Sequence, residues 1–410
     1  MTPNPFFGVF LHWLGGLASG SFVVPYRFVR RWSWETYWLA GGFFSWIIMP
    51  WLMASLNTSD LMGVLRETSP STLYYCAFFG MLWGIGNLTF GLSVRYLGVG
   101  LGMAMVIGWC AVVGTLTEPW YRGEFTAKLI TPFHGNIILI GIFVCLAGVF
   151  ITGLAGRTKE MEMPAEQKLG NVVEFNFRKG VLVAAISGVF SACFAFGLAA
   201  GNPIKELTMR HGTNAIWQGL PVLVVVLAGG FCTNAFWCIY LNIKNRTGFQ
   251  YFKSEIRAES PAAALAAGFG EGAPAKHIPT DGRKDRTPVP LVWNYVFSAM
   301  GGIFWYLQFF FYSMGETQMG AYKFSSWTLH MASIIIFATM WGVILKEWRG
   351  ASGKAILLLR LGVAMLVLST IVVGYGNEIR KQVVRSAAVC TLDREVSLVV
   401  HHDRFNQDFG

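Results

Sequence analysis

The stretch GGIFWYLQFFFYSMGETQMGAYKFSSWTLHM, residues 301–331, decides the fold of this chain. Two apolar runs meet at a short polar turn, and the side chains inside them include Trp305, Gln308, Tyr312, Trp327 and His330. An unpaired polar group in an apolar medium costs roughly 2 to 7 kcal/mol. A glutamine and a histidine in this setting must therefore bond to something. The stretch is predicted to form one wall of a solute-binding cavity inside a membrane.

The composition of the whole chain agrees with a membrane location. Only 13% of its 410 residues are charged, whereas 54% are hydrophobic and 15% are aromatic; soluble domains usually contain roughly 25% charged residues. The formal net charge is +10, but the basic residues lie between apolar runs and form no single stripe. This pattern favours cytoplasmic loops that face anionic lipid over a nucleic-acid partner.

Two further features limit the possible classes of protein. The seven cysteines are odd in number and contain no CxxC pair, so neither a disulfide framework nor a zinc site is predicted. No metal or other cofactor is expected. The N-terminal apolar run lacks a basic region and exceeds the length of a signal peptide, which predicts a retained first span.

Ten mostly apolar segments have the length of about 20 residues that crosses a hydrocarbon core of about 30 Å. Each is expected to be a helix, because a membrane barrel would alternate apolar and polar residues. The predicted spans are residues 6–29, 37–56, 73–97, 98–118, 136–156, 180–201, 216–242, 291–314, 325–346 and 355–375.

The loops that follow the odd-numbered spans hold most of the lysines and arginines between the spans. Basic loops stay on the cytoplasmic side of a membrane. The odd-numbered loops are therefore predicted to be cytoplasmic, and both termini to lie outside.

An internal repeat organises the spans. The segment GVFLHWLGGLASGSF near the N-terminus matches GVLVAAISGVFSACF in the second half of the chain. Because each half then has an odd number of helices, the second half must insert upside down relative to the first, as in many secondary transporters. The matched residues are Gly8 with Gly180, Gly16 with Gly188, Phe22 with Phe194 and, in a second and weaker match, Trp83 with Trp305.

This repeat predicts the domain organisation. Residues 1–156 form a first five-helix repeat, and residues 180–375 form a second one. A charged cytoplasmic connector, residues 157–179, joins them. Within the second repeat, residues 243–290 are rich in Ala, Gly, Pro and charge, and they predict a mobile cytoplasmic loop. A polar tail, residues 376–410, follows.

Several aromatic-rich runs occur in an order typical of one transporter family: GVFLHWLGGLASG, RRWSWETYW, SWIIMPW, WGIGNLTFGLSVRYLGVGLGM, GGIFWYLQFFFYSMG, SSWTLHM and LKEW. They resemble the bacterial L-rhamnose-proton symporter family, a branch of the drug/metabolite transporter superfamily. The resemblance implies ten helices in the inner membrane and import of L-rhamnose coupled to a proton. The alternative is an exporter or facilitator of another small metabolite. An enzyme is not expected, because the spans lack HExxH, paired carboxylates and a catalytic triad.

A sugar site needs aromatic platforms for the apolar C–H faces and neutral donors and acceptors for the hydroxyls. Spacings of three and four residues place such side chains on common helix faces. The alternative is that the two amides bond between helices and that the aromatic rings pack or face lipid. The predicted substrate-binding residues are Trp83, Asn87, Trp305, Gln308, Tyr312 and Trp327.

Proton coupling needs a group that changes charge near neutral pH. The acidic residues Glu35, Glu118 and Glu347 lie at helix ends, so His12 and His330 are the predicted proton carriers. Histidine has an ordinary pKa of about 6.5, and ionisable residues inside a membrane are functional candidates by default. The alternative is a neutral histidine bonded to the carbonyl group of a neighbouring helix.

Overall fold

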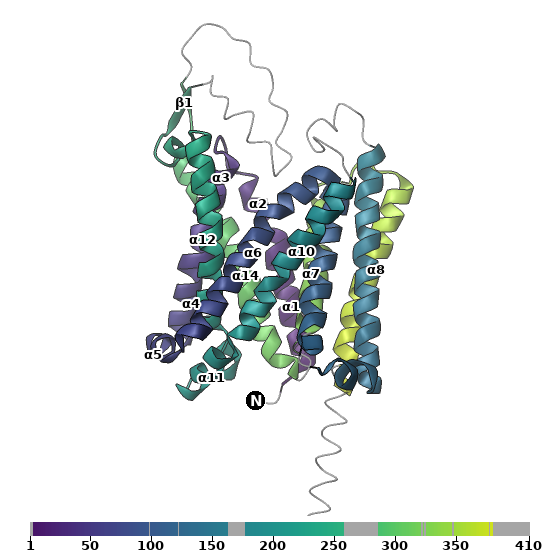
Figure 1. Ribbon diagram of the computed structural model, residues 1–410. Coiled ribbons are helices and arrows are strands. Elements are labelled where there is room, and N and C mark those ends of the chain that lie inside the picture. The colour runs from purple at the N-terminus through teal and green to yellow at the C-terminus, as the bar shows by residue number, and fades with distance from the viewer. Residues whose placement is uncertain are drawn as a thin grey trace, which may run out of the picture.

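The structure is a computed structural model, and most of its chain is a bundle of long helices that run side by side (Figure 1). A short antiparallel hairpin, β1 (Glu255–Arg257) with β2 (Arg286–Pro288), projects from one end of the bundle. We call this end the hairpin end. The structure describes residues 3–97, 99–121, 123–162, 177–257, 286–320, 323, 325–346, 348–376 and 378–379.

The helices fall into two sets in chain order. The first set is α1 (Pro5–Ser21), α2 (Val23–Tyr26), α3 (Trp34–Phe43), the π-helix η1 (Phe44–Ile48), α4 (Met49–Asn57), α5 (Leu61–Glu67), α6 (Pro70–Leu97), α7 (Val99–Tyr121), the π-helix η2 (Thr126–Ile130) and α8 (Phe133–Glu162). The second set is α10 (Phe177–Ala200), α11 (Asn202–Arg210), the 3-10 helix η3 (Ala215–Trp217), α12 (Leu220–Lys244), the 3-10 helix η4 (Gly248–Tyr251), α14 (Leu291–Gln318), α15 (Ser325–Ile344) and a last helix, Gly353–Gly376.

Eight helical segments of the described chain are long and apolar enough to cross a membrane, so the protein is an integral membrane protein whose spans are helices. The other two predicted spans, α7 and α14, are also helical and lie in the same bundle (Figure 1). The eight segments are Pro5–Tyr26, Trp34–Asn57, Pro70–Ser93, Phe133–Lys159, Arg178–Arg210, Ala215–Lys244, Ser325–Ile344 and Gly353–Gly376.

Several helices extend beyond the predicted spans. For example, α8 continues to Glu162, into the predicted connector, and α14 continues to Gln318. The reason is that backbone hydrogen bonds persist after the apolar run has ended, whereas hydropathy detects only the apolar run. The two ends of the predicted loop 243–290 are also ordered, as η4 and the hairpin. Residues 258–285 and the tail from residue 380 lie outside the described residues.

The first helix of each set packs against helices of the other set. α1 lies mainly against α14 and α15, and α10 lies mainly against α6 and α7. Glycines make the close approach possible: a Cβ at Gly16 would meet the Ser333 side chain, and a Cβ at Gly188 would lie 2.8 Å from the Val106 carbonyl oxygen. Such small residues allow helices to associate in lipid, where no hydrophobic drive brings them together.

A polar network closes the hairpin end. The carboxylate of Glu35, at the start of α3, accepts hydrogen bonds from Thr247 Oγ1 at 2.8 Å and Asn245 Nδ2 at 3.1 Å. Beside it, Gln250 Oε1 accepts a bond from the Ser33 backbone N–H at 2.8 Å. Glu35 is only 5% exposed, so these donors take the place of water around its side-chain oxygens. The network ties α3 to the turn after α12.

A second polar tie lies at the opposite end, which carries α5, α11 and the N-terminus and which we call the N-terminal end (Figure 1). His211, just after α11, places Nε2 2.9 Å from Glu67 Oε2 and Nδ1 3.2 Å from Asp60 Oδ2. The hydrogen bond to Glu67, with a smaller contribution from Asp60, raises the pKa of His211 above its ordinary value. This cluster joins α5 to α11.

The His211 cluster predicts a pH-dependent stability. A raised pKa in the folded state stabilises the protein fully below the unfolded pKa of about 6.5, and the effect is lost as pH rises through the folded pKa. The variant His211→Gln should therefore melt below the wild type near pH 6 and together with it near pH 9. Thermal unfolding in detergent across this range measures the difference. A difference that is the same at every pH would contradict the role of the charged imidazole.

Candidate functional site

Two buried histidines face each other in the middle of the bundle. His12 on α1 and His330 on α15 have ring centroids 6.3 Å apart. The ring of Tyr312, on α14, lies 5.4 Å from that of His12 and 5.2 Å from that of His330. The histidines are 0% and 1% exposed. Three residues that the sequence predicted for two separate roles thus form one contiguous cluster.

Glycines on the facing helices make room for both imidazoles. A Cβ at Gly315 would lie 2.9 Å from His12 Cε1, and a Cβ at Gly15 would lie 3.0 Å from His330 Cε1. Among the described residues, none of the four ring nitrogens has a well-aligned hydrogen-bond partner. A buried polar group left unsatisfied costs about 1 to 3 kcal/mol. The alternative reading, a histidine bonded to a carbonyl group of a neighbouring helix, corresponds to a contact between His330 and the His12 backbone that does not meet hydrogen-bond geometry.

Trp327 joins the cluster as a platform. Its ring centroid lies 5.5 Å from that of Tyr312, and its Nε1–H donates to the Cys110 carbonyl oxygen at 3.0 Å. The polar edge of the indole is therefore already used by α7. What Trp327 can offer to a solute is its ring face.

Trp83 reaches the cluster through two phenylalanines that the sequence analysis did not single out. Its ring lies 5.1 Å from Phe194 and 5.4 Å from Phe309, and Phe194 stacks 5.9 Å from Trp327. In a chain with 33 phenylalanines, helical spacing alone cannot separate a ring that faces the interior from one that faces lipid. The match of Phe194 with Phe22 in the internal repeat was the only available signal.

The remaining predicted residues contribute polar atoms without partners. Gln308 Nε2, Asn87 Nδ2 and Trp305 Nε1 are all buried, and none has a hydrogen-bond partner in the described part of the protein. Interhelical bonding, the alternative for the two amides, does not account for these donors. Trp305 lies on the hairpin-end side of Gln308, with its ring 6.2 Å from Phe309.

A buried ion pair escaped the sequence analysis. Lys205 on α11 places Nζ 3.1 and 3.0 Å from the two carboxylate oxygens of Glu316 on α14. Glu316 lies in the last turn of α14, which extends past the predicted end of its span, so the sequence analysis did not consider it. The side chain of Glu118 and residue Glu347 lie outside the described residues.

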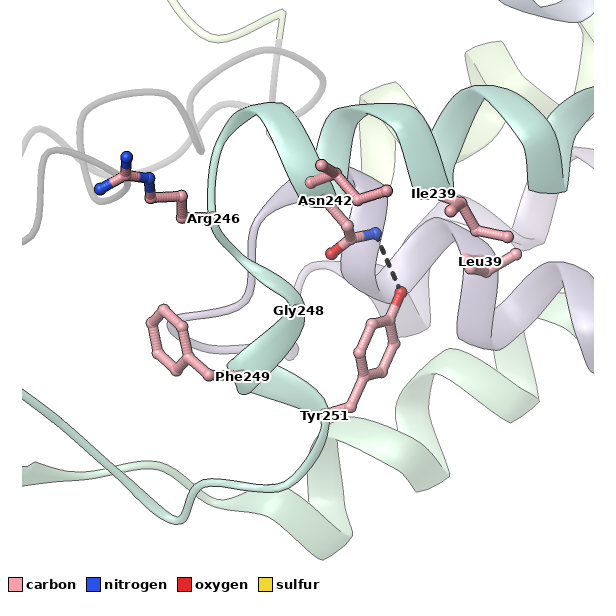
Figure 2. A pocket seen from close by; sticks show the side chains of 8 residues that line it. Leu39, Ile239, Asn242, Arg246, Gly248, Phe249 and Tyr251 are labelled. Atoms are coloured by element: carbon pink, nitrogen blue, oxygen red, sulfur yellow. Dashed lines mark hydrogen bonds between the residues drawn. The ribbon is translucent and has the colours of Figure 1, made fainter.

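A further cavity lies away from this cluster. It has a volume of about 490 Å³ and lies at the hairpin end, between α3, the end of α12 and η4. Figure 2 shows that Asn242 donates to the Tyr251 hydroxyl across it, at 3.2 Å, while Arg246 points away from the other lining residues. The cavity contains none of the unpartnered buried groups described above. No group of three or more His, Cys, Asp or Glu suited to a metal ion occurs in the described residues.

A multi-helix membrane protein with buried histidines and aromatic platforms has the features of a transporter of small solutes. The model of the family described as L-rhamnose-proton symport protein matches residues 1–253 and 285–378. The chain belongs to this family. The L-rhamnose-proton symporters of Salmonella paratyphi A and Salmonella typhi are each 34% identical to it over 371 residues, 90% of this chain and 97% of theirs. That of Cronobacter sakazakii is 34% identical over 372 residues, with the same coverage. These names describe symporters, which agrees with the expectation that the chain is not an enzyme.

The Lys205–Glu316 pair predicts a large loss of stability from a single substitution. Lys205→Met leaves Glu316 buried without its counter-charge, and breaking a buried pair costs about 3 to 5 kcal/mol. The side chains are 6% and 16% exposed, so we expect about 3 kcal/mol. Adding Glu316→Gln should restore much of the loss. Thermal unfolding of the single and double variants measures both effects.

The control is Arg210→Met on the same helix. Arg210 lies 4.0 Å from Glu206, and these side chains are 73% and 64% exposed. Exposed pairs contribute about 0 to 1 kcal/mol, so this variant should unfold like the wild type. Equal effects of the Lys205 and Arg210 substitutions would contradict the burial argument.

Proposed function

We propose that the protein imports L-rhamnose, or a similar 6-deoxy sugar, together with a proton. The observation that carries this proposal is the His12–Tyr312–His330 cluster, in which two titratable rings without hydrogen-bond partners lie among aromatic platforms. The relatives are named L-rhamnose-proton symporters. The geometry supports binding of sugar and proton at adjacent places inside the bundle.

The sugar is proposed to lie between α6, α14 and α15. The ring faces of Trp83, Trp305 and Trp327 provide platforms for its C–H faces. Gln308 and Asn87 provide amide donors that are buried and without partners, so a hydroxyl group would satisfy them. Tyr312 contacts both histidines, which places the sugar site next to the proton site.

The proton is proposed to be held by the histidine pair. Two imidazolium charges on rings 6.3 Å apart would repel each other in a medium of low dielectric constant. The pair is therefore expected to hold one proton at a time, shared as a coupled unit. Glu316 is the competing acidic group, but Lys205 already balances its charge.

The proposed architecture is ten spans in two inverted five-helix repeats, residues 1–156 and 180–375. Equivalent contacts support it. The Phe22 ring lies 4.3 Å from Trp305, and the Phe194 ring lies 5.1 Å from Trp83. Because the repeat pairs Phe22 with Phe194 and Trp83 with Trp305, both contacts join the first helix of one half to the third helix of the other. Alternating access would follow from rocking of the halves around the central cluster.

The proposed location is the bacterial inner membrane, with the hairpin end and the other odd-numbered loops in the cytoplasm and both termini outside. The basic residues of these loops support this orientation. A reporter enzyme fused after residue 410 tests it. If a reporter that functions only in the cytoplasm is active at this position, the C-terminus lies inside and the proposed orientation is wrong.

Uptake into proteoliposomes is the direct test of function. An imposed inward proton gradient should drive concentrative uptake of labelled L-rhamnose by the wild type. His12→Gln and His330→Gln should each lose gradient-driven accumulation by at least about tenfold, because neutral glutamine cannot carry the proton. Both variants should retain counterflow exchange, which needs the sugar site but no net proton movement.

Ser369→Ala is a matched control, because Ser369 is buried on the last helix, away from the proposed sugar and proton sites, and donates to the Leu366 carbonyl oxygen at 2.8 Å. Full accumulation by both histidine variants would reject the proton site. A wild type that takes up another metabolite, or that exports, would favour the alternative of a drug/metabolite-type exporter or facilitator. Competition by a panel of sugars and metabolites separates these outcomes.

A further inference from the structure

A second aromatic cluster lies between the central cluster and the hairpin end, and we call it the aromatic box. It surrounds a small cavity of about 10 Å³ between the α1–α2 junction, α2, α3, η1 and α14. Glycines provide the room for its walls: a Cβ at Gly301 would lie 2.7 Å from Tyr26 Cζ, and one at Gly41 would meet the Tyr26 hydroxyl. The lining residues are Phe22, Tyr26, Trp38, Gly42, Ser45, Trp46 and Trp305.

Three polar atoms of the aromatic box are buried without a partner among the described residues. They are Ser45 Oγ, Trp46 Nε1 and Trp305 Nε1. Ser45 is 1% and Trp46 is 2% exposed. By contrast, the indole N–H of Trp38 donates to Asn234 Oδ1 at 3.3 Å. Packing alone does not explain three unsatisfied groups around one cavity, because each costs about 1 to 3 kcal/mol.

The backbone at this position is also unusual. Ser45 and Trp46 lie in the π-helix η1, Phe44–Ile48, where the Met49 N–H bonds to the Phe44 carbonyl oxygen. π-helical turns are rare and occur frequently at functional sites. Here the wider turn lies where the two unsatisfied side chains enter the aromatic box. The helix therefore departs from α geometry at the place where a ligand would need it.

We infer that the aromatic box is a second binding position for a neutral pyranose sugar, on the hairpin-end side of the central cluster. This inference rests on the proposed function. Indole faces would contact the C–H groups of the sugar, and Ser45, Trp46 and Trp305 would bond its hydroxyls. Trp305 contacts both the aromatic box and Phe309 of the central cluster. A sugar leaving the central cluster would thus meet the box on its way to the cytoplasm.

The aromatic box must widen to admit the sugar. The ring centroids of Trp38 and Trp305 are 6.2 Å apart and their planes are inclined at 63°, so the two rings contact each other edge to face and leave no slot between them. Carbon atoms in contact lie about 3.5 to 4.0 Å apart, so a sugar held between two aromatic rings needs them about 7 to 8 Å apart. In this conformation the cavity of about 10 Å³ has room for about one water molecule, so α3 and α14 must move apart before a sugar can enter. Rocking of the two halves moves these helices relative to each other, because they belong to different halves.

The test compares the two membrane faces. Ser45→Ala and Trp46→Phe each remove one hydroxyl or indole donor from the aromatic box. Exchange of L-rhamnose is measured in vesicles that expose either the hairpin-end face or the N-terminal-end face. From the hairpin-end face, each variant should raise the half-saturating L-rhamnose concentration by about three- to tenfold, which is the effect of losing one hydrogen bond. From the N-terminal-end face the change should stay within about twofold. Trp237→Phe, at an indole that is 41% exposed on α12, is the matched control.

Other outcomes overturn the inference in distinguishable ways. Equal increases from both faces would place these residues in the central site, and lower maximal rates with unchanged half-saturation would make the aromatic box a gate. Variants with the same half-saturating concentrations as the wild type would reject the aromatic box as a binding position and leave the proposed function untouched. If the wild type shows no proton-driven uptake of any sugar, the proposed function itself fails. Melting temperatures within a few degrees of the wild type establish that each variant is folded.

Discussion

A polar side chain inside a bundle of apolar helices must find a partner, because no water is present to replace one. Backbone groups meet this constraint through helix hydrogen bonds, but side chains must meet it one by one. In this protein Glu35, Lys205 and Glu316 are fully or largely buried, and each has close partners. The constraint therefore stabilises the two ends of the bundle, where residues far apart in the chain are tied together.

The middle of the bundle violates the same constraint. His12, His330 and Gln308 are as well buried as the groups at the two ends, yet their ring nitrogens and amide nitrogen lack partners among the described residues. The energy lost there is of the same order as the energy gained from several hydrogen bonds at the ends. The buried charged side chains Glu35, Lys205 and Glu316 have partners at the ends, whereas the titratable rings of the central cluster have no well-aligned partner, which is the arrangement expected of a place that binds a solute or a proton. That arrangement is the physical basis of the proposed transport site.

Part of this arrangement could be predicted from sequence. The positions of His12 and His330 within apolar runs favoured an interior location, but their contacts with Tyr312 depend on how α1, α14 and α15 pack together and could not be predicted. The Lys205–Glu316 pair could not be predicted, because hydropathy ended the eighth span before Glu316 and the pair joins helices far apart in the chain. The π-helix η1 was also out of reach, since a wider turn changes neither composition nor apolar length.

The distribution of unsatisfied groups also bears on how the two halves work together. Trp305 belongs to the second half, yet its ring contacts Phe22 of the first half at 4.3 Å. The proposed repeat would pair this contact with that between Phe194 and Trp83, which lies within the central cluster. If the halves exchange conformations during transport, the Phe22–Trp305 contact takes on the surroundings that the Phe194–Trp83 contact has in this structure, and the reverse. The aromatic box and the Trp83 side of the central cluster would then widen in alternation. A sugar ring would pass from one aromatic surface directly to the equivalent surface of the other half.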